Sequence, residues 1–145
     1  VKSKIIKKYL PLINQQVNRY LQMMDFYINF TLDEEFNETV QSPIHEDFSY
    51  ASFSEGEKQR IDLALLFTWR EVAKFKISVA TNLMILDEVF DSSLDGQGTE
   101  EFLKIIRFVV KDANIFVISH KGGMDDRFDD VIRFEKMKGF SSMVK

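Results

Sequence analysis

Two short, uninterrupted apolar runs most strongly limit the folds open to this chain. The first spans residues 83–86, the second spans residues 115–118, and a helical pattern lies between them over residues 99–112. Apolar runs of this length, bounded by polar residues, are typical of parallel strands that are covered on both faces. Strand, helix and strand in this order predict an α/β layer with a right-handed crossover. We therefore expect an α/β protein with a parallel sheet.

Titratable residues stand just beyond both predicted strands. Asp87 and Glu88 follow the first run, and His120 lies two residues after the second. Ligands of such sheets bind beyond the carboxyl ends of the strands. One carboxylate there can hold a hydrated Mg²⁺ while the other orients or deprotonates a water, as hydrolysis of a phosphoanhydride requires, and a histidine can hydrogen-bond a phosphate. Each residue taken alone is also open to a structural role, as a helix cap or a strand-end histidine.

The segment from Ser54 to Arg60 opens a long helix, expected from Glu55 to about residue 76. Ser54 and Glu57 have the spacing of a capping box, in which each side chain bonds a backbone amide of the other. Gly56 would let a ligand approach the backbone closely, and the free amides and the helix dipole favour an anion such as phosphate. An ordinary capping box with a solvated run of charges is the alternative.

The remaining patterns predict elements around this layer. Residues 3–25 carry the apolar stripe of an amphipathic helix, which Pro11 should kink or divide. Residues 26–32 alternate as a half-buried strand. The acidic stretch 33–47 is expected to be a loop or irregular hairpin, followed by a short extended segment over residues 48–53. The tail should form a hairpin that turns near Gly139.

Composition and charge narrow the classes of function. The 145 residues suffice for one domain, and the absence of cysteine fits a reducing compartment, so a cytoplasmic location is expected, host cytoplasm if the protein is viral. No apolar run reaches the roughly 18 residues of a membrane span. Residues 1–8 carry a charge of +4 and residues 133–145 a charge of +3. Because the net charge of the chain is −4, the other 124 residues carry −11. Such a chain is no general nucleic-acid binder, although either end can contact phosphate.

One stretch imitates a calcium loop. Residues 91–96 place oxygen donors at the first, third and fifth positions of the loop and a glycine at the sixth. The twelfth position, which should be a bidentate glutamate, is Phe102. Without that ligand the pattern does not support an EF-hand.

The order of these motifs resembles the C-terminal lobe of an ABC-type ATPase head, a member of the P-loop NTPase superfamily. By this resemblance, residues 54–57 are the signature motif, residues 83–88 the Walker B strand, residues 93–95 the D-loop, and His120 the switch histidine. The flanks are similar to the SMC-like DNA-repair ATPases of the SbcC type, among them the large subunits of bacteriophage recombination exonucleases. The signature departs from the family at Glu55, where glycine is usual.

The resemblance also implies an arrangement of domains. Residues 1–25 would be the root helix of a long antiparallel coiled coil, where such ATPases dock a nuclease subunit, and residues 26–145 would be the C-terminal ATPase lobe. None of the six glycines is followed by the Lys-Ser or Lys-Thr of a P-loop. An N-terminal lobe of the same ATPase would therefore supply the P-loop.

The roles implied for individual residues follow the family motifs. ATP and Mg²⁺ are the expected cofactors: Asp87 would hold Mg²⁺ through water, Glu88 would polarise the attacking water, and His120 would contact the γ-phosphate. The signature residues Ser54, Gly56 and Glu57, with Asp95 of the D-loop, would face the nucleotide of a second head in a homodimer.

Double-stranded DNA and a nuclease would be the further partners of the ATPase, and no membrane partner is expected.

Two alternatives to this ATPase function stay open. One alternative is a non-catalytic ABC-like scaffold, which the missing P-loop and Glu55 favour. The other is the ATP-binding subunit of a transporter, which the helix over residues 3–25 disfavours, because it is typical of a coil root.

Overall fold

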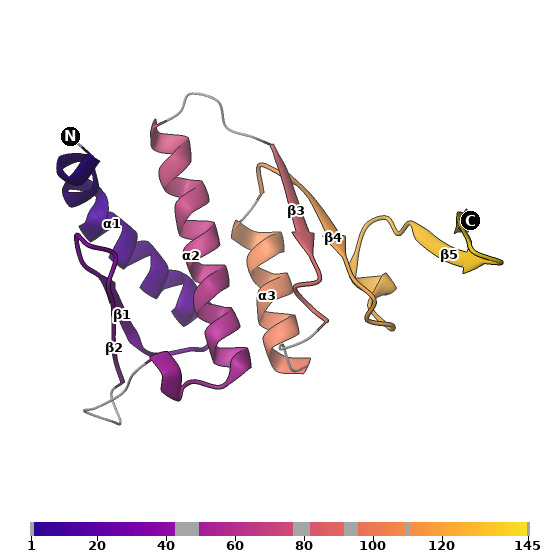
Figure 1. The fold of residues 1–145 in the computed structure, drawn as a ribbon, viewed down its shortest axis with the longest axis horizontal. Coiled ribbons are helices and arrows are strands. Elements are labelled where there is room, and N and C mark those ends of the chain that lie inside the picture. The colour runs from indigo at the N-terminus through magenta and orange to yellow at the C-terminus, as the bar shows by residue number, and fades with distance from the viewer. Residues whose placement is uncertain (1, 43–49, 77–81, 92–95, 110, 145) are drawn as a thin grey trace.

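The computed structural model describes residues 2–42, 50–76, 82–91, 96–109 and 111–144 (Figure 1). These residues form three α-helices, three two-stranded sheets and two short 3₁₀ helices. In chain order the elements are α1 (Lys2–Met23), β1 (Asn29–Leu32), β2 (Glu38–Gln41), η1 (Tyr50–Ser52), α2 (Glu55–Lys76), β3 (Leu83–Asp87), α3 (Gly96–Val109), β4 (Asn114–Ile118), η2 (Asp125–Arg127), β5 (Arg133–Met137) and β6 (Phe140–Val144). Within the described helices, none has the length and apolar character needed to cross a bilayer.

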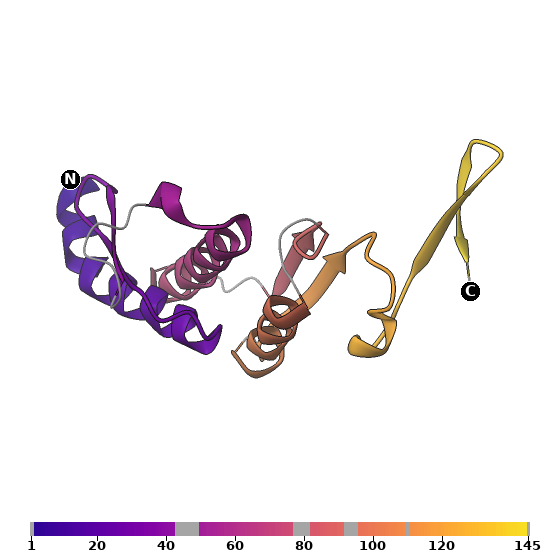
Figure 2. The same cartoon turned by 90° about the horizontal axis from the view of Figure 1, so that it is seen from below.

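The elements lie in a row from the N-terminal helix to the C-terminal hairpin. α1 and α2 lie side by side, and α3 follows α2 in the row, on one face of the strands β3 and β4 (Figures 1 and 2). β3 and β4 pair in parallel, with Asp87 opposite Ile118 at their carboxyl ends. The antiparallel hairpin β5–β6 projects away from the other elements (Figure 2). The predicted strand, helix and parallel strand are therefore confirmed.

α1 is one helix that buries the predicted apolar stripe. Pro11 does not divide the helix, which continues through it. A proline at position 11 removes only the hydrogen bond to the carbonyl of Lys7, one turn earlier, and both residues are exposed, so water can satisfy that carbonyl. The buried side chains of the stripe are Leu10, Ile13, Val17, Tyr20, Leu21 and Met24.

The hairpin β1–β2 is tied to α1 by two asparagines one helical turn apart. Asn18 accepts a hydrogen bond from the Phe30 N–H at 2.8 Å and donates one to the Phe30 carbonyl at 2.7 Å. Asn14 bonds Leu32 in the same way, at 2.8 and 3.1 Å. The side chains therefore act as a third strand along the free edge of β1 and satisfy backbone groups that β2 does not reach.

In the region after β1, the expected hairpin is present but regular rather than irregular, and the expected extended segment is wrong. Residues 33–47 contain a regular strand, β2, which pairs with β1 from Asn29 opposite Gln41 to Leu32 opposite Glu38. The segment expected to be extended over residues 48–53 instead contains the 3₁₀ helix η1, while residues 43–49 lie outside the described part of the chain. Polar composition concealed β2, because Val40 is its one buried side chain.

A column of aromatic side chains connects the helices to the end of β3. The ring centroids of Tyr20 and Phe67 are 5.5 Å apart, those of Phe67 and Phe102 are 5.9 Å apart, and those of Phe102 and Phe90 are 5.0 Å apart. All four side chains are at most 2% exposed. Since Phe90 lies two residues after Glu88, the core reaches from α1 to the strand end where the candidate site lies.

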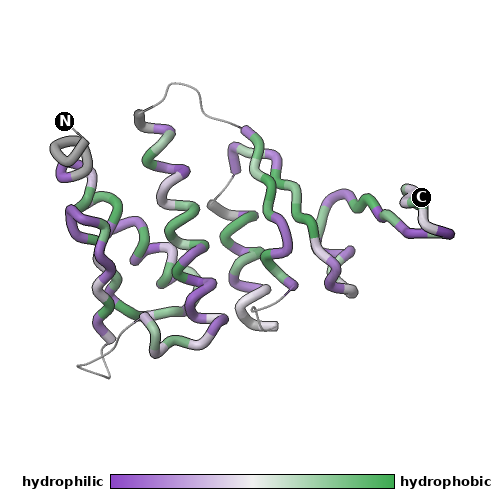
Figure 3. Tube along the Cα trace, in the orientation of Figure 1, coloured by the Kyte–Doolittle hydropathy of each residue, from purple (hydrophilic) through white to green (hydrophobic). Residues whose placement is uncertain are grey.

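The sheet of β3 and β4 is covered on one face, whereas the apolar runs predicted cover on both. Met84 and Leu86 are buried on the side of α3, but Ile85 is 60% exposed and Phe116 is 54% exposed on the opposite side. Figure 3 shows that both strands are hydrophobic along their length. The sequence pattern is therefore that of a fully covered strand, although no described residue covers the second face.

The predicted turn of the C-terminal hairpin is confirmed. Met137 pairs with Phe140, and the two residues between them, Lys138 and Gly139, have φ angles of 51° and 88°. Two consecutive positive φ values define a type I′ turn, which matches the twist of a hairpin. The side chains of both strands are exposed, including Phe140 at 80%.

Candidate functional site at the carboxyl ends of β3 and β4

Four element ends meet at one edge of the molecule. The carboxyl ends of β3 and β4 point to the same side because the strands are parallel, and α2 and α3 begin on that side (Figure 1). The Gln59 side chain, in the second turn of α2, donates a hydrogen bond to the Val89 carbonyl at 2.6 Å. This bond joins α2, two residues beyond the predicted signature motif, to the residue that follows the predicted Walker B strand.

Glu88 and His120 lie together at this edge. The Glu88 N–H donates to the Ile118 carbonyl at 2.8 Å, which extends the strand pairing by one residue beyond Asp87. Glu88 has a φ of 55°, a left-handed conformation that is uncommon outside glycine and accompanies an abrupt change of chain direction. Its carboxylate Oε1 lies 3.6 Å from His120 Nε2, and both side chains are more than 60% exposed. A solvent-accessible acid and imidazole therefore face each other.

Asp87 occupies the last position of β3 and faces the opposite way to Met84 and Leu86. Strand alternation places it on the uncovered side of the sheet, with Leu83 and Ile85, and its side chain is exposed. A carboxylate oxygen at this place suits Mg²⁺, which prefers oxygen ligands and retains several of its waters. Although Asp87 and Glu88 are adjacent, the Asp87 side chain therefore faces the uncovered side of the sheet, while the Glu88 side chain faces His120.

Asp91 is a site residue that the sequence analysis missed. One of its carboxylate oxygens accepts a hydrogen bond from the Ser119 hydroxyl, and the other accepts one from the His120 N–H at 2.8 Å. These bonds, with that of the Ser119 hydroxyl first, hold the pKa of Asp91 below its usual value, since they favour the charged form. Ligand atoms of Glu88, Asp91 and His120 lie within 4.8 Å of one another. This spacing is compatible with a divalent cation or an ordered water among them.

The capping box predicted at the start of α2 is confirmed. The Ser54 N–H and the Ser54 hydroxyl each donate to Glu57 Oε2 at 2.8 Å, and the Glu57 N–H donates to the Ser54 hydroxyl at 3.3 Å. The Glu55 side chain is 79% exposed and pairs with Lys58 at 2.8 Å, so it does not cover the helix end. Gly56 is half-buried. The capping role and a role toward an anion are both compatible with this geometry.

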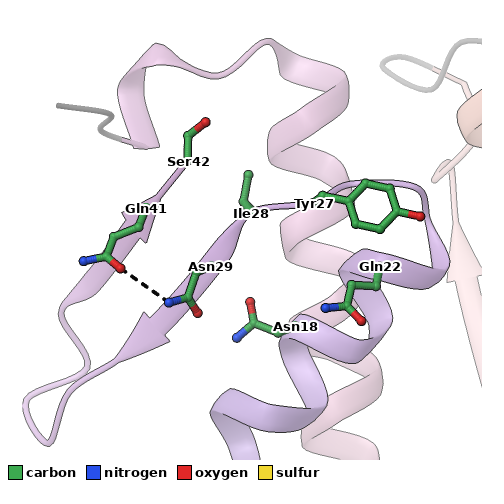
Figure 4. A pocket seen from close by; sticks show the side chains of 7 residues that line it. All are labelled: Asn18, Gln22, Tyr27, Ile28, Asn29, Gln41 and Ser42. Atoms are coloured by element: carbon green, nitrogen blue, oxygen red, sulfur yellow. Dashed lines mark hydrogen bonds between the residues drawn. The ribbon is translucent and has the colours of Figure 1, made fainter. Parts of the chain in front are cut away.

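Asp95 and the rest of the predicted D-loop, Ser93 and Leu94, lie outside the described residues. An open pocket of about 530 Å³ lies elsewhere, between the end of α1 and the β1–β2 hairpin, with Asn18, Tyr27 and Gln41 among its lining residues (Figure 4). None of the residues that line this pocket is a candidate site residue.

Comparison with known proteins identifies two groups of relatives, although no family model matches the chain. Exonuclease subunit 2 of Enterobacteria phage T4 is 51% identical over 144 residues, which is 99% of this chain and 26% of that protein. Exonuclease subunit 2 of Escherichia phage RB69 is 46% identical over 143 residues, 99% of this chain and 25% of that protein. The chain thus spans about a quarter of the length of these relatives.

Comparison with solved structures identifies the fold. A structure described as showing ATP-driven dimerisation and DNA-stimulated activation of SMC ATPases matches with a TM-score of 0.76 at 18% identity, over 98% of this chain and 88% of that chain. The SMC head domain from Thermotoga maritima matches with a TM-score of 0.65 at 25% identity, over 98% of this chain and 51% of that chain. The chain therefore has the fold of an SMC-type ATPase head of the P-loop NTPase kind, and it is homologous to a segment of the phage exonuclease subunit 2 proteins.

Proposed function

We propose that this chain is the C-terminal lobe of a split ATPase head, and that the head hydrolyses ATP with Mg²⁺ once an N-terminal lobe supplies the P-loop. The observation that carries the proposal is the 3.6 Å approach of the Glu88 carboxylate and His120 at the carboxyl ends of two parallel strands. That is where ligands bind in open α/β sheets. A scaffold would not need an exposed acid and imidazole in these places.

The uncovered face of the β3–β4 sheet supports the need for a second lobe. Leu83, Ile85, Phe116 and Ile118 are each about half exposed or more on that face, and Asp87 lies among them. Parallel sheets occur almost only with both faces covered, and a two-stranded sheet is marginal on its own. A lobe seated here would bring its P-loop lysine and hydroxyl next to Asp87.

The residues of this chain would then act as follows. Asp87 holds Mg²⁺ through a water, Glu88 polarises the water that attacks the γ-phosphate, and His120 contacts that phosphate. Bound Mg²⁺ supplies charge neutralisation of the phosphates. Ser54 and Gly56, at the start of α2, face the nucleotide of a second head, together with Glu57 and Asp95.

On the same proposal, the head belongs to a DNA-recombination machine. Two ATP molecules close two heads into a homodimer, and hydrolysis reopens them. α1 is the root of a coiled coil to which a nuclease subunit binds, and the dimer grips double-stranded DNA and gates that nuclease. The names of the phage relatives support a nuclease complex, and the description of the SMC structure supports ATP-driven dimerisation.

The test is ATP turnover by the assembled head, made from this chain and a lobe that carries the P-loop. Glu88→Gln should leave nucleotide binding intact and lower turnover by roughly 10²- to 10⁴-fold, the range for loss of a general base. Glu35→Gln, which changes an exposed acid in the β1–β2 turn, is the matched control and should have no effect. Unchanged hydrolysis by Glu88→Gln would refute the assignment. A folded mixture that neither binds nor hydrolyses ATP would favour the non-catalytic scaffold.

A further inference from the structure

We propose that Asp91 is a positioning residue of the hydrolytic site, which holds the backbone of His120 in register with Glu88. This inference rests on the proposed function, in which Glu88 and His120 act on the attacking water and the γ-phosphate. Asp91 belongs to none of the motifs by which the sequence resembles an ATPase head. Its role is visible only where the loops after β3 and β4 come together.

The first argument is the pattern of hydrogen bonds that Asp91 makes. Its carboxylate bonds the Ser119 hydroxyl through one oxygen and the His120 N–H, at 2.8 Å, through the other. Its own N–H donates to the Glu88 carbonyl at 3.2 Å. A single residue therefore connects the backbone of the proposed base to the backbone of the proposed switch histidine. Hydrogen bonds to a charged carboxylate are about twice as strong as those between neutral groups, which suits a residue that holds the backbone of His120 in place.

The second argument is that, among the described residues, few other contacts fix His120. The His120 side chain is 84% exposed, and its ring contact with Glu88, at 3.6 Å, is longer than a hydrogen bond. Glu88, in contrast, is held by the strand ladder, because its N–H bonds the Ile118 carbonyl at 2.8 Å. The position of the imidazole relative to Glu88 is thus set by where the backbone of residues 119 and 120 is placed.

Ser119 extends this hydrogen-bond network by one residue. Its hydroxyl donates to Asp91 and accepts a hydrogen bond from the Lys121 N–H at 3.0 Å. The carboxylate of Asp91 therefore orders three consecutive residues after β4. Displacement of a reacting group by about 1 Å can lower turnover by roughly 100-fold, so loss of this order should act on kcat.

The experiment uses the assembled head and compares three changes at two positions. Asp91→Ala should lower kcat for ATP by roughly 10- to 100-fold and leave KM within about 3-fold. Asp91→Asn should recover most of that loss, because its amide oxygen can accept from the His120 N–H while its amide N–H donates to the Ser119 hydroxyl. Ser119→Ala should have an intermediate effect. Asp130→Ala removes an exposed aspartate and is the control for loss of charge.

A double-mutant cycle separates positioning from any direct role. If Asp91 acts through His120, Asp91→Ala should cause no further loss of kcat in a His120→Ala background. A further loss there, or an Asp91→Asn variant as impaired as Asp91→Ala, would overturn the proposal in favour of a charge or cation-ligand role. Full activity of Asp91→Ala would overturn it outright. If Asp91→Ala does not fold, Asp91→Asn and Ser119→Ala in the two backgrounds decide. Glu88→Gln, measured alongside, distinguishes failure of this inference from failure of the proposed ATPase.

Discussion

Replacing Asn18 by alanine should release the β1–β2 hairpin from α1 without unfolding the rest of the lobe. Asn18 satisfies both backbone groups of Phe30, a residue that is 0% exposed, so alanine leaves a buried N–H and a buried carbonyl without their partners. Each net hydrogen bond is worth about 1 kcal/mol, and a buried unsatisfied group costs about 1–3 kcal/mol. Because Asn18 is itself half-buried, water can reach part of the gap. For the two groups together the cost is about 2–6 kcal/mol, and we expect the low end of that range, about 2 kcal/mol.

Hydrogen exchange measures this local opening in the assembled head. A loss of about 2 kcal/mol corresponds to roughly 30-fold faster exchange of the Phe30 amide, at 1.4 kcal/mol for each factor of ten. Asn14→Ala should do the same at Leu32, while Gln15→Ala, an exposed change on the same helix, should do neither. Unchanged protection of Phe30 in Asn18→Ala, or an equal rise in exchange throughout the lobe, would refute the reasoning.

Three further predictions concern a helix cap, a turn and an ion pair. Ser54→Ala should lower the free energy of unfolding by about 1 kcal/mol in denaturant titrations, because it removes the hydroxyl that caps α2, and Ser54→Asp should restore most of it. Gly139→Ala should cost about 1 kcal/mol, since the residue has a φ of 88° in the hairpin turn, and a cost near zero would contradict the type I′ assignment. The Lys74 ammonium holds the pKa of Asp112 below its usual value. The stabilisation from this pair is therefore fully present above about pH 4 and is lost as pH falls through the lowered pKa of Asp112. Asp112→Asn should therefore flatten the acid side of the plot of unfolding free energy against pH. An unchanged plot would rule out a stabilising pair.

The elements predicted well are those whose signal is local. α2 begins at Glu55 and ends at Lys76 as expected, because the capping box that marks its start is formed by residues only three positions apart. The parallel pairing of β3 and β4 was equally accessible, because two apolar runs separated by one helix leave few arrangements. The ends of those strands also placed Glu88 and His120 correctly at one edge.

The features that were missed depend on contacts between distant segments. Asp91 gains its role from Ser119 and His120, almost thirty residues away, and the sequence offered only a false likeness to a calcium loop. β2 was hidden because a polar edge strand has no distinctive period. Asn14 and Asn18 are polar residues on a helix, and their use as an edge for β1 cannot be read from spacing.

The prediction that both faces of the β3–β4 sheet are covered differs from the structure, and the difference bears on the mechanism. Apolar residues at Leu83 and Ile85 have no partner among the described elements, so the sequence pattern describes the assembled head rather than this lobe alone. Asp87 shares their face, while the turn at Glu88 brings the next carboxylate to His120. On the proposed function, the metal-binding acid is therefore completed by the second lobe, whereas the water-activating acid is positioned within this one. It follows that assembly of the two lobes should govern Mg²⁺ and nucleotide binding, and that the geometry of Glu88, His120 and Asp91 should govern turnover.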